Sequence, residues 1–176
     1  MTHEMVHLIR PLIPALRRYA RALLRDRAAA DDLVQDCLER AISRWHQRRE
    51  DYDARAWIFT ILHNLAMTRL RRSARRPVHV GLDETDATGL SVAASQEDGL
   101  RHRELLAALA QLPEEQRSVL LLVTVEELSY AEAARVLDVP IGTVMSRLSR
   151  ARERLARLMS AEPRATISTP YLRSVK

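Results

Sequence analysis

The 176-residue sequence has few of the residues on which several large protein classes depend. Its 4 glycines form no Gly-rich phosphate loop, and its single cysteine, Cys37, excludes an internal disulfide and a cysteine-based zinc site. Only 4% of the residues are aromatic, which is poor for a β-sandwich and compatible with a helical chain of Ala, Leu and Arg. No apolar run approaches the ~18 residues of a membrane span. The N-terminus also lacks the pattern of a secretion signal, so we expect a cytoplasmic protein without membrane insertion.

Lysine is nearly absent, because 27 of the 28 basic residues are arginine, and the net charge of +5 is unevenly distributed. Residues 1–76 have a net charge of +7 and residues 139–159 of +4, whereas 77–104 and 105–138 are each at −4. Two basic segments that flank an acidic middle indicate two separate contacts with a polyanion.

The composition divides the chain into two helical lobes. Residues 77–104 hold glycines among acidic and hydroxyl side chains with no sustained period, which is typical of a solvated linker. We therefore predict an all-α fold, with two small helical domains at 1–76 and 105–159 that are joined by a flexible acidic linker. Residues 160–176 contain two prolines and are predicted to form a disordered tail.

The first lobe begins with two predicted amphipathic helices. One covers Leu8 to Leu24, and Pro11 and Pro14 leave its start undefined. The other begins near Asp31 or Asp32, either of which could cap it. Its apolar stripe consists of Leu33, Val34, Cys37, Leu38, Ala41, Ile42 and Trp45.

The opposite side of this second helix forms an acidic ridge on an otherwise basic lobe. Taken alone, such a ridge is most often a solvated helix face. The alternative is a docking surface for a basic partner helix. We call it the acidic face, and it consists of Asp32, Gln35, Asp36 and Glu39.

A third predicted helix, Ala54 to Arg72, ends in a cluster of arginines. Five arginines within eight residues can neutralise several phosphates, which is more than a helix dipole requires, so we favour nucleic acid as the partner. Trp57 and Phe59 cannot both face the same core, and one of them is a candidate for stacking on a base. The arginine cluster consists of Arg69, Arg71, Arg72, Arg75 and Arg76.

Local signals divide the second lobe into short helices. Leu105 begins a helix that stops before Pro113, and this proline opens the next helix. Ser129 and Glu132 then form a capping box, S-x-x-E, at the start of a further helix, which can run only to about Leu137.

Asp138 and Pro140 break that helix and lead into a longer one, whose apolar residues recur at helical spacing. A short helix, a tight turn and a longer helix make a helix-turn-helix. The polar outer face of the longer helix suits the major groove and its phosphates. An ordinary helical hairpin, the alternative, leaves the +4 charge of this helix unexplained. We call this surface the recognition face, and it consists of Thr143, Met145, Ser146, Arg147, Ser149, Arg150, Arg152 and Arg154.

These motifs resemble a known family. The second lobe is similar to the C-terminal promoter-binding domain of extracytoplasmic-function (ECF) sigma factors in LPEEQRSVLLL (112–122), ELSYAEAA (127–134) and PIGTVMSRLSRAR (140–152). The first lobe is similar to that family's N-terminal domain in DDLVQDCLERA (31–41) and RAWIFTILHNLA (55–66). The two resemblances occur in the family's order and cover the chain apart from the predicted tail.

The resemblance implies a bacterial initiation subunit that brings RNA polymerase core enzyme to promoter DNA. The acidic face would then contact the core enzyme rather than remain solvated. Trp57, His63, Asn64 and the arginine cluster would read and open the minus-10 element, and the recognition face would read the minus-35 element. Such factors are usually controlled by an anti-sigma factor, and they need no cofactor or small-molecule substrate.

Two positions depart from the family pattern. Met145 stands where the recognition helix usually has lysine, so one phosphate or base contact is lost or becomes apolar. Asp138 stands where the turn usually has glycine, and aspartate tolerates the left-handed conformation better than most residues.

Two other functions stay open at this point. A dimeric helix-turn-helix regulator that acts without core polymerase would have no need of the acidic face, and no apolar dimer surface is evident. A DNA-free helical adaptor that switches between protein partners would have no need of the arginine cluster.

No set of residues predicts catalysis or a metal site. His3 to His7 spells H-E-x-x-H, a zinc-protease motif, but no third ligand is paired with it and the other histidines are scattered. Cys37 lies on an apolar stripe, where a free cysteine is usually an inert core residue. We therefore expect neither an enzyme nor a bound metal.

Overall fold

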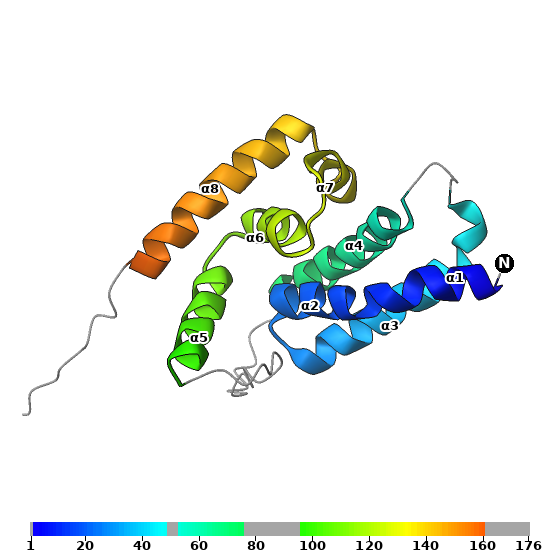
Figure 1. Cartoon of the computed structure of the whole chain (residues 1–176), viewed down its shortest axis with the longest axis horizontal. Helices are drawn as coiled ribbons and strands as arrows, with labels where there is room; N and C mark the ends of the chain where they lie inside the picture. The colour runs from blue at the N-terminus through cyan, green and yellow to red at the C-terminus, as the bar shows by residue number, and fades with distance from the viewer. Residues whose placement is uncertain (1, 49–52, 76–95, 161–176) are drawn as a thin grey trace, which may run out of the picture.

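The computed structural model describes residues 2–48, 53–75 and 96–160, which form helices joined by short turns. No strand occurs among these residues, which confirms the predicted all-α class. The elements are α1 (Thr2–Ile9), η1 (Arg10–Leu12), α2 (Ile13–Leu24), α3 (Arg27–Ser43), η2 (Trp45–Gln47), α4 (Ala54–Arg75), α5 (Gln96–Ala110), α6 (Glu114–Leu120), η3 (Leu121–Val125), α7 (Tyr130–Leu137) and α8 (Ile141–Ser160). Figure 1 shows α1 to α4 gathered in one lobe and α5 to α8 in the other.

Two prolines divide the first predicted helix into three pieces. Instead of one helix over Leu8 to Leu24, α1 is followed by the 3-10 turn η1 and then by α2. Pro11 lies at the start of η1 and Pro14 at the start of α2. Each proline lacks a backbone N–H, which costs nothing in a first turn where that group has no partner within the helix.

The start of α3 corrects a prediction. Its N-cap is Asp26, whose carboxylate accepts a hydrogen bond from the backbone N–H of Ala29 at 3.0 Å. The prediction that Asp31 or Asp32 caps this helix is therefore wrong, because both lie inside it. Asp31 instead accepts a 3.2 Å hydrogen bond from Arg21 of α2, so its charge joins two helices.

The first lobe is a packed bundle of α2, α3 and α4. Tyr19 and Phe59 are both fully buried, and their rings meet edge to face with centroids 5.6 Å apart. Cys37 is buried in the same core, its thiol donates to the carbonyl of Ile58 at 3.6 Å, and burial raises its pKa to about 12. This is the environment of an inert core thiol, as predicted. Ile42 departs from the predicted stripe, since it is 52% exposed.

The second lobe begins earlier than predicted. α5 starts at Gln96, so residues 96–104, which we assigned to the linker, are helical. The rest of that segment and the predicted tail from Ala161 lie outside the described residues. α5 packs against α8 and also contacts α2 of the first lobe. Its packing against other helices therefore outweighs the polar composition that suggested a linker.

A π-helical turn, η3, follows α6 and was not predicted. The backbone N–H of Glu126 donates to the carbonyl of Leu121 at 2.9 Å, which is the five-residue spacing of a π-turn. Such turns are uncommon and frequently lie at functional sites. Glu127 then takes a left-handed backbone conformation with φ 52°, which turns the chain towards α7.

The helix-turn-helix forms as its local signals predict. Ser129 Oγ accepts from the Glu132 N–H at 3.2 Å, and Glu132 Oε2 accepts from the Ser129 N–H at 2.7 Å, which completes the capping box. Asp138 adopts φ 53°, the left-handed conformation that its side chain tolerates. α8 begins directly after Pro140.

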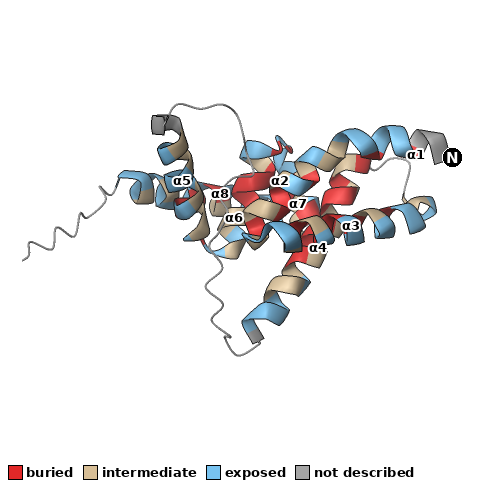
Figure 2. Ribbon diagram, turned by 90° about the horizontal axis from the view of Figure 1, so that it is seen from below, coloured by how far each residue is buried: buried red, intermediate tan, exposed pale blue. Residues whose placement is uncertain are grey.

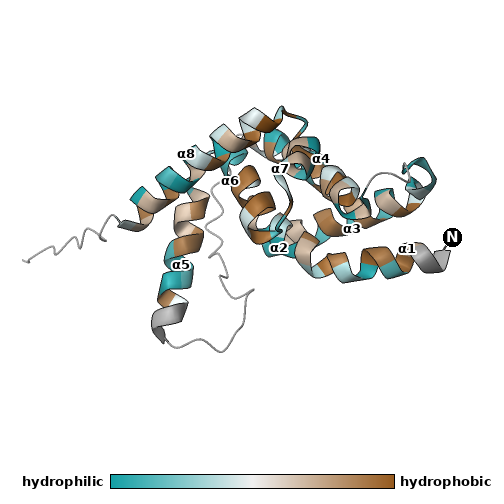
Figure 3. Ribbon diagram, turned by 45° about the horizontal axis from the view of Figure 1, so that its top comes forward, coloured by the Kyte–Doolittle hydropathy of each residue, from teal (hydrophilic) through white to brown (hydrophobic). Residues whose placement is uncertain are grey.

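The two lobes are packed against each other and share one apolar core. Buried residues of α2, α4, α6 and α7 lie together at the centre of the molecule (Figure 2), and α4 packs against α7. Leu16 and Phe59 from the first lobe and Leu122 and Val136 from the second belong to this cluster. The hydropathy colouring of Figure 3 shows apolar and polar residues alternating along the helices, as amphipathic packing requires.

Candidate nucleic-acid interface

The acidic face lies on the outside of α3. Asp32, Gln35, Asp36 and Glu39 are all exposed and share one side of the helix because they are three or four positions apart. Gln35 donates to Glu39 at 3.4 Å, and the Asp32 carboxylate lies 3.7 Å from the Arg69 guanidinium. The side chain of Asp32 is nevertheless 73% exposed. The structure therefore brings all four residues together on a surface that is open to a partner.

The arginine cluster of α4 is divided between two environments. Arg69 is half-buried and donates to the backbone carbonyl of Ala29 at 2.9 Å, so it fastens α4 to α3. Arg71 and Arg72 are exposed. Arg75 is the last residue of α4 and its side chain is not described, while Arg76 lies outside the described residues.

The two aromatic residues of α4 have separate surroundings. Phe59 belongs to the core, so Trp57 is the outer of the two. Trp57 is half-buried and meets Trp45 edge to face, with ring centroids 5.9 Å apart. Arg48 lies over the Trp45 ring at 4.9 Å from its centroid. Trp57 therefore already packs against a neighbouring aromatic ring before any base could reach it.

His63 and Asn64 point in different directions. His63 is only 8% exposed, and its Nδ1 lies 3.0 Å from the Tyr19 hydroxyl. Burial, followed by the nearby charge of Arg71, lowers the pKa of His63 to about 4, so the ring is neutral at neutral pH. Asn64 is exposed on the next position of the helix. In this conformation His63 supports helix packing and offers little surface to DNA, whereas Asn64 is accessible.

α8 divides lengthwise into a buried and an exposed side. Val144, Leu148 and Ala151 are buried against the rest of the second lobe. The recognition face lies opposite: Thr143, Ser146 and Arg147 are half-buried, and Met145, Ser149, Arg150, Arg152 and Arg154 are exposed.

Several polar groups of the recognition face already have partners within the chain. Arg147 forms a 2.7 Å ion pair with Glu115 of α6, and its side chain is 22% exposed. Ser146 donates to the carbonyl of Thr143 at 3.1 Å, and Ser149 donates to Glu153 at 3.2 Å. A DNA duplex would have to displace Glu115 before both guanidinium edges of Arg147 were available.

A cleft of ≈ 410 Å³ brings parts of the two predicted DNA surfaces together. Asn64 and Arg71 line it from α4, and Arg147 lines it from α8. Glu114 and Glu115 of α6 line the same cleft. The predicted minus-10 and minus-35 surfaces therefore meet across a narrow gap that also holds carboxylates.

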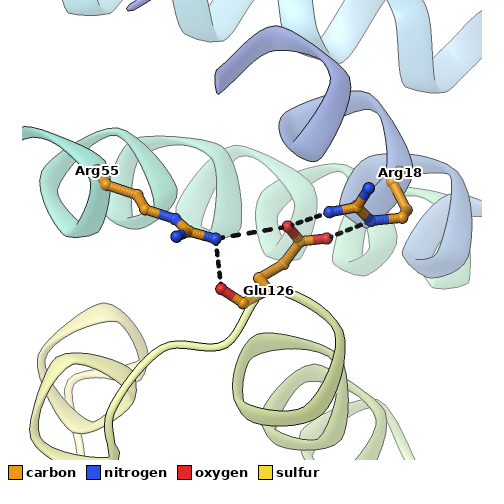
Figure 4. Close-up of polar contacts among 3 residues, drawn as sticks. All are labelled: Arg18, Arg55 and Glu126. Atoms are coloured by element: carbon orange, nitrogen blue, oxygen red, sulfur yellow. Dashed lines mark hydrogen bonds and ion pairs between the residues drawn. The ribbon is translucent and has the colours of Figure 1, made fainter. Parts of the chain in front are cut away.

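Sequence reasoning missed Glu126, which joins the two lobes. Its side chain has 0% exposure, and it accepts hydrogen bonds from Arg18 at 2.9 and 2.7 Å (Figure 4). Arg55 donates to its backbone carbonyl. The available signal was an acidic residue that directly follows an apolar run, which does not by itself identify a partner.

Neither a metal centre nor a membrane segment emerges from the described residues. No group of three or more His, Cys, Asp or Glu side chains among them could hold a metal ion. None of their helices is long and apolar enough to cross a bilayer.

Comparison with known proteins assigns both lobes. Residues 9–63 match the family model for the "Sigma2 domain of PhyR", and residues 102–155 match "Sigma-70, region 4". The chain is 37% identical over 147 residues to the ECF RNA polymerase sigma factor EcfG of Rhodopseudomonas palustris, with 84% of this chain and 80% of that protein covered. The chain belongs to the ECF sigma factor family. It is also 35% identical over 150 residues to the ECF sigma factor SigM of Mycobacterium tuberculosis, which covers 82% of this chain and 71% of that one.

Solved structures of the family share this arrangement of helices. The ECF sigma factor described here matches the sigma factor RpoE of Bartonella quintana, in complex with the anti-sigma factor NepR, with a TM-score of 0.73 and 30% identity over 92% of this chain and 97% of that one. It matches CnrH, in complex with the cytosolic domain of CnrY, with a TM-score of 0.70 and 26% identity over 92% and 91%. The helix-turn-helix of α7 and α8 lies within the match to region 4.

Proposed function

We propose that this ECF sigma factor binds RNA polymerase core enzyme through the acidic face of α3, and promoter DNA through α4 and α8. It would act in the cytoplasm as a binding subunit that catalyses no reaction of its own. The relatives at 35% to 37% identity are sigma factors, which supports binding rather than catalysis.

The division of α8 into two sides carries the proposal. Its buried side holds it in the lobe, which leaves Arg150, Arg152 and Arg154 free to approach a duplex. Guanidinium groups pair with phosphates and with the O6 and N7 acceptors of guanine, so this surface suits the minus-35 element. The arginine cluster of α4, with Asn64, would take the minus-10 element.

The acidic face complements a basic partner. Asp32, Asp36 and Glu39 are exposed within a lobe whose net charge is +7 over residues 1–76, so they are out of place on a surface meant only for DNA. We therefore assign this face to the core polymerase, with Gln35 as its uncharged member.

In vitro transcription with core polymerase tests the proposal. The double variant Asp32→Arg, Asp36→Arg should lose the salt-resistant complex with core enzyme and keep its helicity. The double variant Glu104→Arg, Glu127→Arg makes the same charge change at exposed sites outside the acidic face and should bind normally. Retained binding by the first variant would remove the acidic face from the proposal.

Arg150→Ala tests the recognition face, with Arg157→Ala as a matched control on the exposed last turn of α8. Loss of a base contact should weaken binding to the upstream element by about 1–3 kcal/mol and relax its sequence preference. Loss of a phosphate contact should instead lower the slope of log affinity against log salt by about 1. If Arg150→Ala and Arg157→Ala behave alike, α8 does not read the DNA through this residue.

Control by an anti-sigma factor is the remaining part of the proposal. The matched structures of RpoE and CnrH are complexes with NepR and CnrY, respectively, and the match to this chain extends over both lobes. We propose an anti-sigma factor as a partner of this chain as well. Co-expression with a candidate anti-sigma factor should block formation of the complex with core enzyme.

A partner-switching adaptor stays a distinct second candidate because residues 9–63 match the sigma domain of PhyR. An adaptor would bind an anti-sigma factor and fail to bind core enzyme or DNA. The exposed arginines of α8 favour the sigma factor, and the core-binding assay separates the two.

A further inference from the structure

The boundary between the two lobes contains a buried ionic cluster. Glu126 is the only carboxylate among the buried residues that the structure describes. Its two oxygens accept from Arg18 Nε at 2.9 Å and Nη2 at 2.7 Å, and Arg55 Nη2 lies 3.9 Å from Oε2 while it donates to the Glu126 carbonyl. Figure 4 shows both guanidinium groups converging on this one residue. We call the three residues the Glu126 clasp.

The clasp joins elements that belong to different domains. Arg18 lies on α2 and Arg55 in the first turn of α4, both in the first lobe. Glu126 directly follows η3 in the second lobe, where the π-turn and the left-handed Glu127 direct it across the boundary. Neither lobe alone supplies both charges, so the clasp exists only when the lobes are docked.

The chemistry of the clasp makes docking conditional on charge. Removing a carboxylate from water is strongly unfavourable unless it gains partners, and here Arg18 and Arg55 supply them. When the lobes separate, Glu126 returns to water, and Arg18 and Arg55 are already 39% and 35% exposed. The ion pair between Arg18 and Glu126 therefore adds little to the stability of either lobe alone. A reversed charge at Glu126, in contrast, would be strongly unfavourable, and only in the docked form.

The docked form cannot contact both promoter elements at once. Elements centred about 10 and 35 base pairs upstream lie roughly 85 Å apart along B-DNA. In the structure, Arg71 and Arg147 line one cleft of ≈ 410 Å³. The Glu115 carboxylate forms a 2.7 Å ion pair with the Arg147 guanidinium. The lobes must therefore move apart before α4 and α8 reach their separate sites.

We propose that the Glu126 clasp is an autoinhibitory contact that holds the free protein in the docked form, in which Asn64, Arg71 and Arg147 line one cleft and cannot reach separate promoter elements. Lobe docking is independent of the proposed function, whereas its inhibitory effect rests on the DNA surfaces assigned above.

The test compares two lysine substitutions of acidic residues in the full chain. Glu126→Lys replaces the buried carboxylate and faces two arginines, so the lobes should separate. Glu104→Lys makes the same charge change at an exposed residue of α5, outside the clasp, and should leave them docked. Arg18→Glu should also open the protein, and Arg18→Glu combined with Glu126→Lys should restore docking in part, because a new ion pair replaces the old one.

The distance between the lobes is measured by electron spin resonance between labels at Ser43→Cys on α3 and Ser160→Cys on α8, both exposed positions. Cys37 is buried with a raised thiol pKa, so it escapes labelling. The parent protein and Glu104→Lys should give one narrow distance. Glu126→Lys and Arg18→Glu should give a broad and different distribution with unchanged helical circular dichroism.

DNA binding supplies the second measurement, with a short mixed-sequence duplex as the probe. If the docked form holds about 90% of the free molecules, its release should tighten binding about tenfold for Glu126→Lys relative to Glu104→Lys. Narrow, unchanged distances in folded Glu126→Lys and Arg18→Glu would overturn the clasp. If Glu126→Lys fails to fold, Arg18→Glu on the other lobe decides. Altered distances with unaltered DNA affinity would overturn the inhibitory role and leave docking intact.

Discussion

His63 should make the protein unstable in mild acid. Its ring is 8% exposed and lies 3.0 Å from the Tyr19 hydroxyl, and burial lowers its pKa from 6.5 to about 4. Between these values the unfolded chain binds a proton that the folded chain does not bind. The free energy of unfolding is therefore unaffected by this group above pH 6.5 and falls as the pH drops towards 4.

The size of the effect follows from the two pKa values. A change from 6.5 to about 4 corresponds to about 3 kcal/mol between pH 7 and pH 4. This is a large part of the 5–15 kcal/mol typical of a domain. Other groups also titrate in this range, so the prediction concerns the difference between two proteins and not the total acid sensitivity.

Urea denaturation followed by circular dichroism at several pH values measures this difference. His63→Gln removes the titrating ring and therefore lacks this loss. Between pH 7 and pH 4, the decrease in its free energy of unfolding should be about 3 kcal/mol smaller than the decrease in the parent protein. His46→Gln changes an exposed histidine and should retain the parent's dependence. Equal pH dependence of the parent protein and His63→Gln would refute the reasoning that this ring is held neutral by burial.

Three further outcomes are expected from local features of the structure. Ser129→Ala removes the capping box and should lower the free energy of unfolding by about 1 kcal/mol; an unchanged denaturation midpoint would contradict the role of the cap. Asp138→Val places a β-branched residue at φ 53° and should cost about 1–2 kcal/mol, whereas Asp138→Gly should be tolerated; equal stability of the two variants would rule out a left-handed turn. Cys37 should react with a thiol reagent only after denaturation, since its pKa is raised to about 12, and fast labelling of the folded protein would show that the thiol is accessible.

Local chemistry explains why the helix-turn-helix could be predicted closely. The Ser129 and Glu132 pair, the left-handed Asp138 and the break at Pro140 act within a few residues, so the sequence contains the whole signal. The same holds for the buried side of α8, which follows from the helical period alone. The family resemblance also rests on these short stretches.

Predictions failed where several local choices were close in energy. Asp26, Asp31 and Asp32 are all acceptable N-caps, and the path of the chain out of α2 selected Asp26. Asp31 was then free to pair with Arg21. Ile42 continues the apolar period of α3 yet is 52% exposed, although Ala41 beside it is buried. Such outcomes depend on which elements pack together, and periodicity does not report that.

The sequence by itself determined the all-helical class. It also predicted two lobes, the first strongly basic and the second divided into an acidic part and a basic helix, and the helix faces assigned to DNA. Only the tertiary structure decided that the lobes dock, that Arg147 meets Glu115, and that Glu126 is buried between two arginines. Arg18 and Glu126 are 108 positions apart in the chain. An ion pair over that separation leaves no periodic or local signal, because its energy arises from the low-dielectric boundary that exists only after both lobes have folded and met.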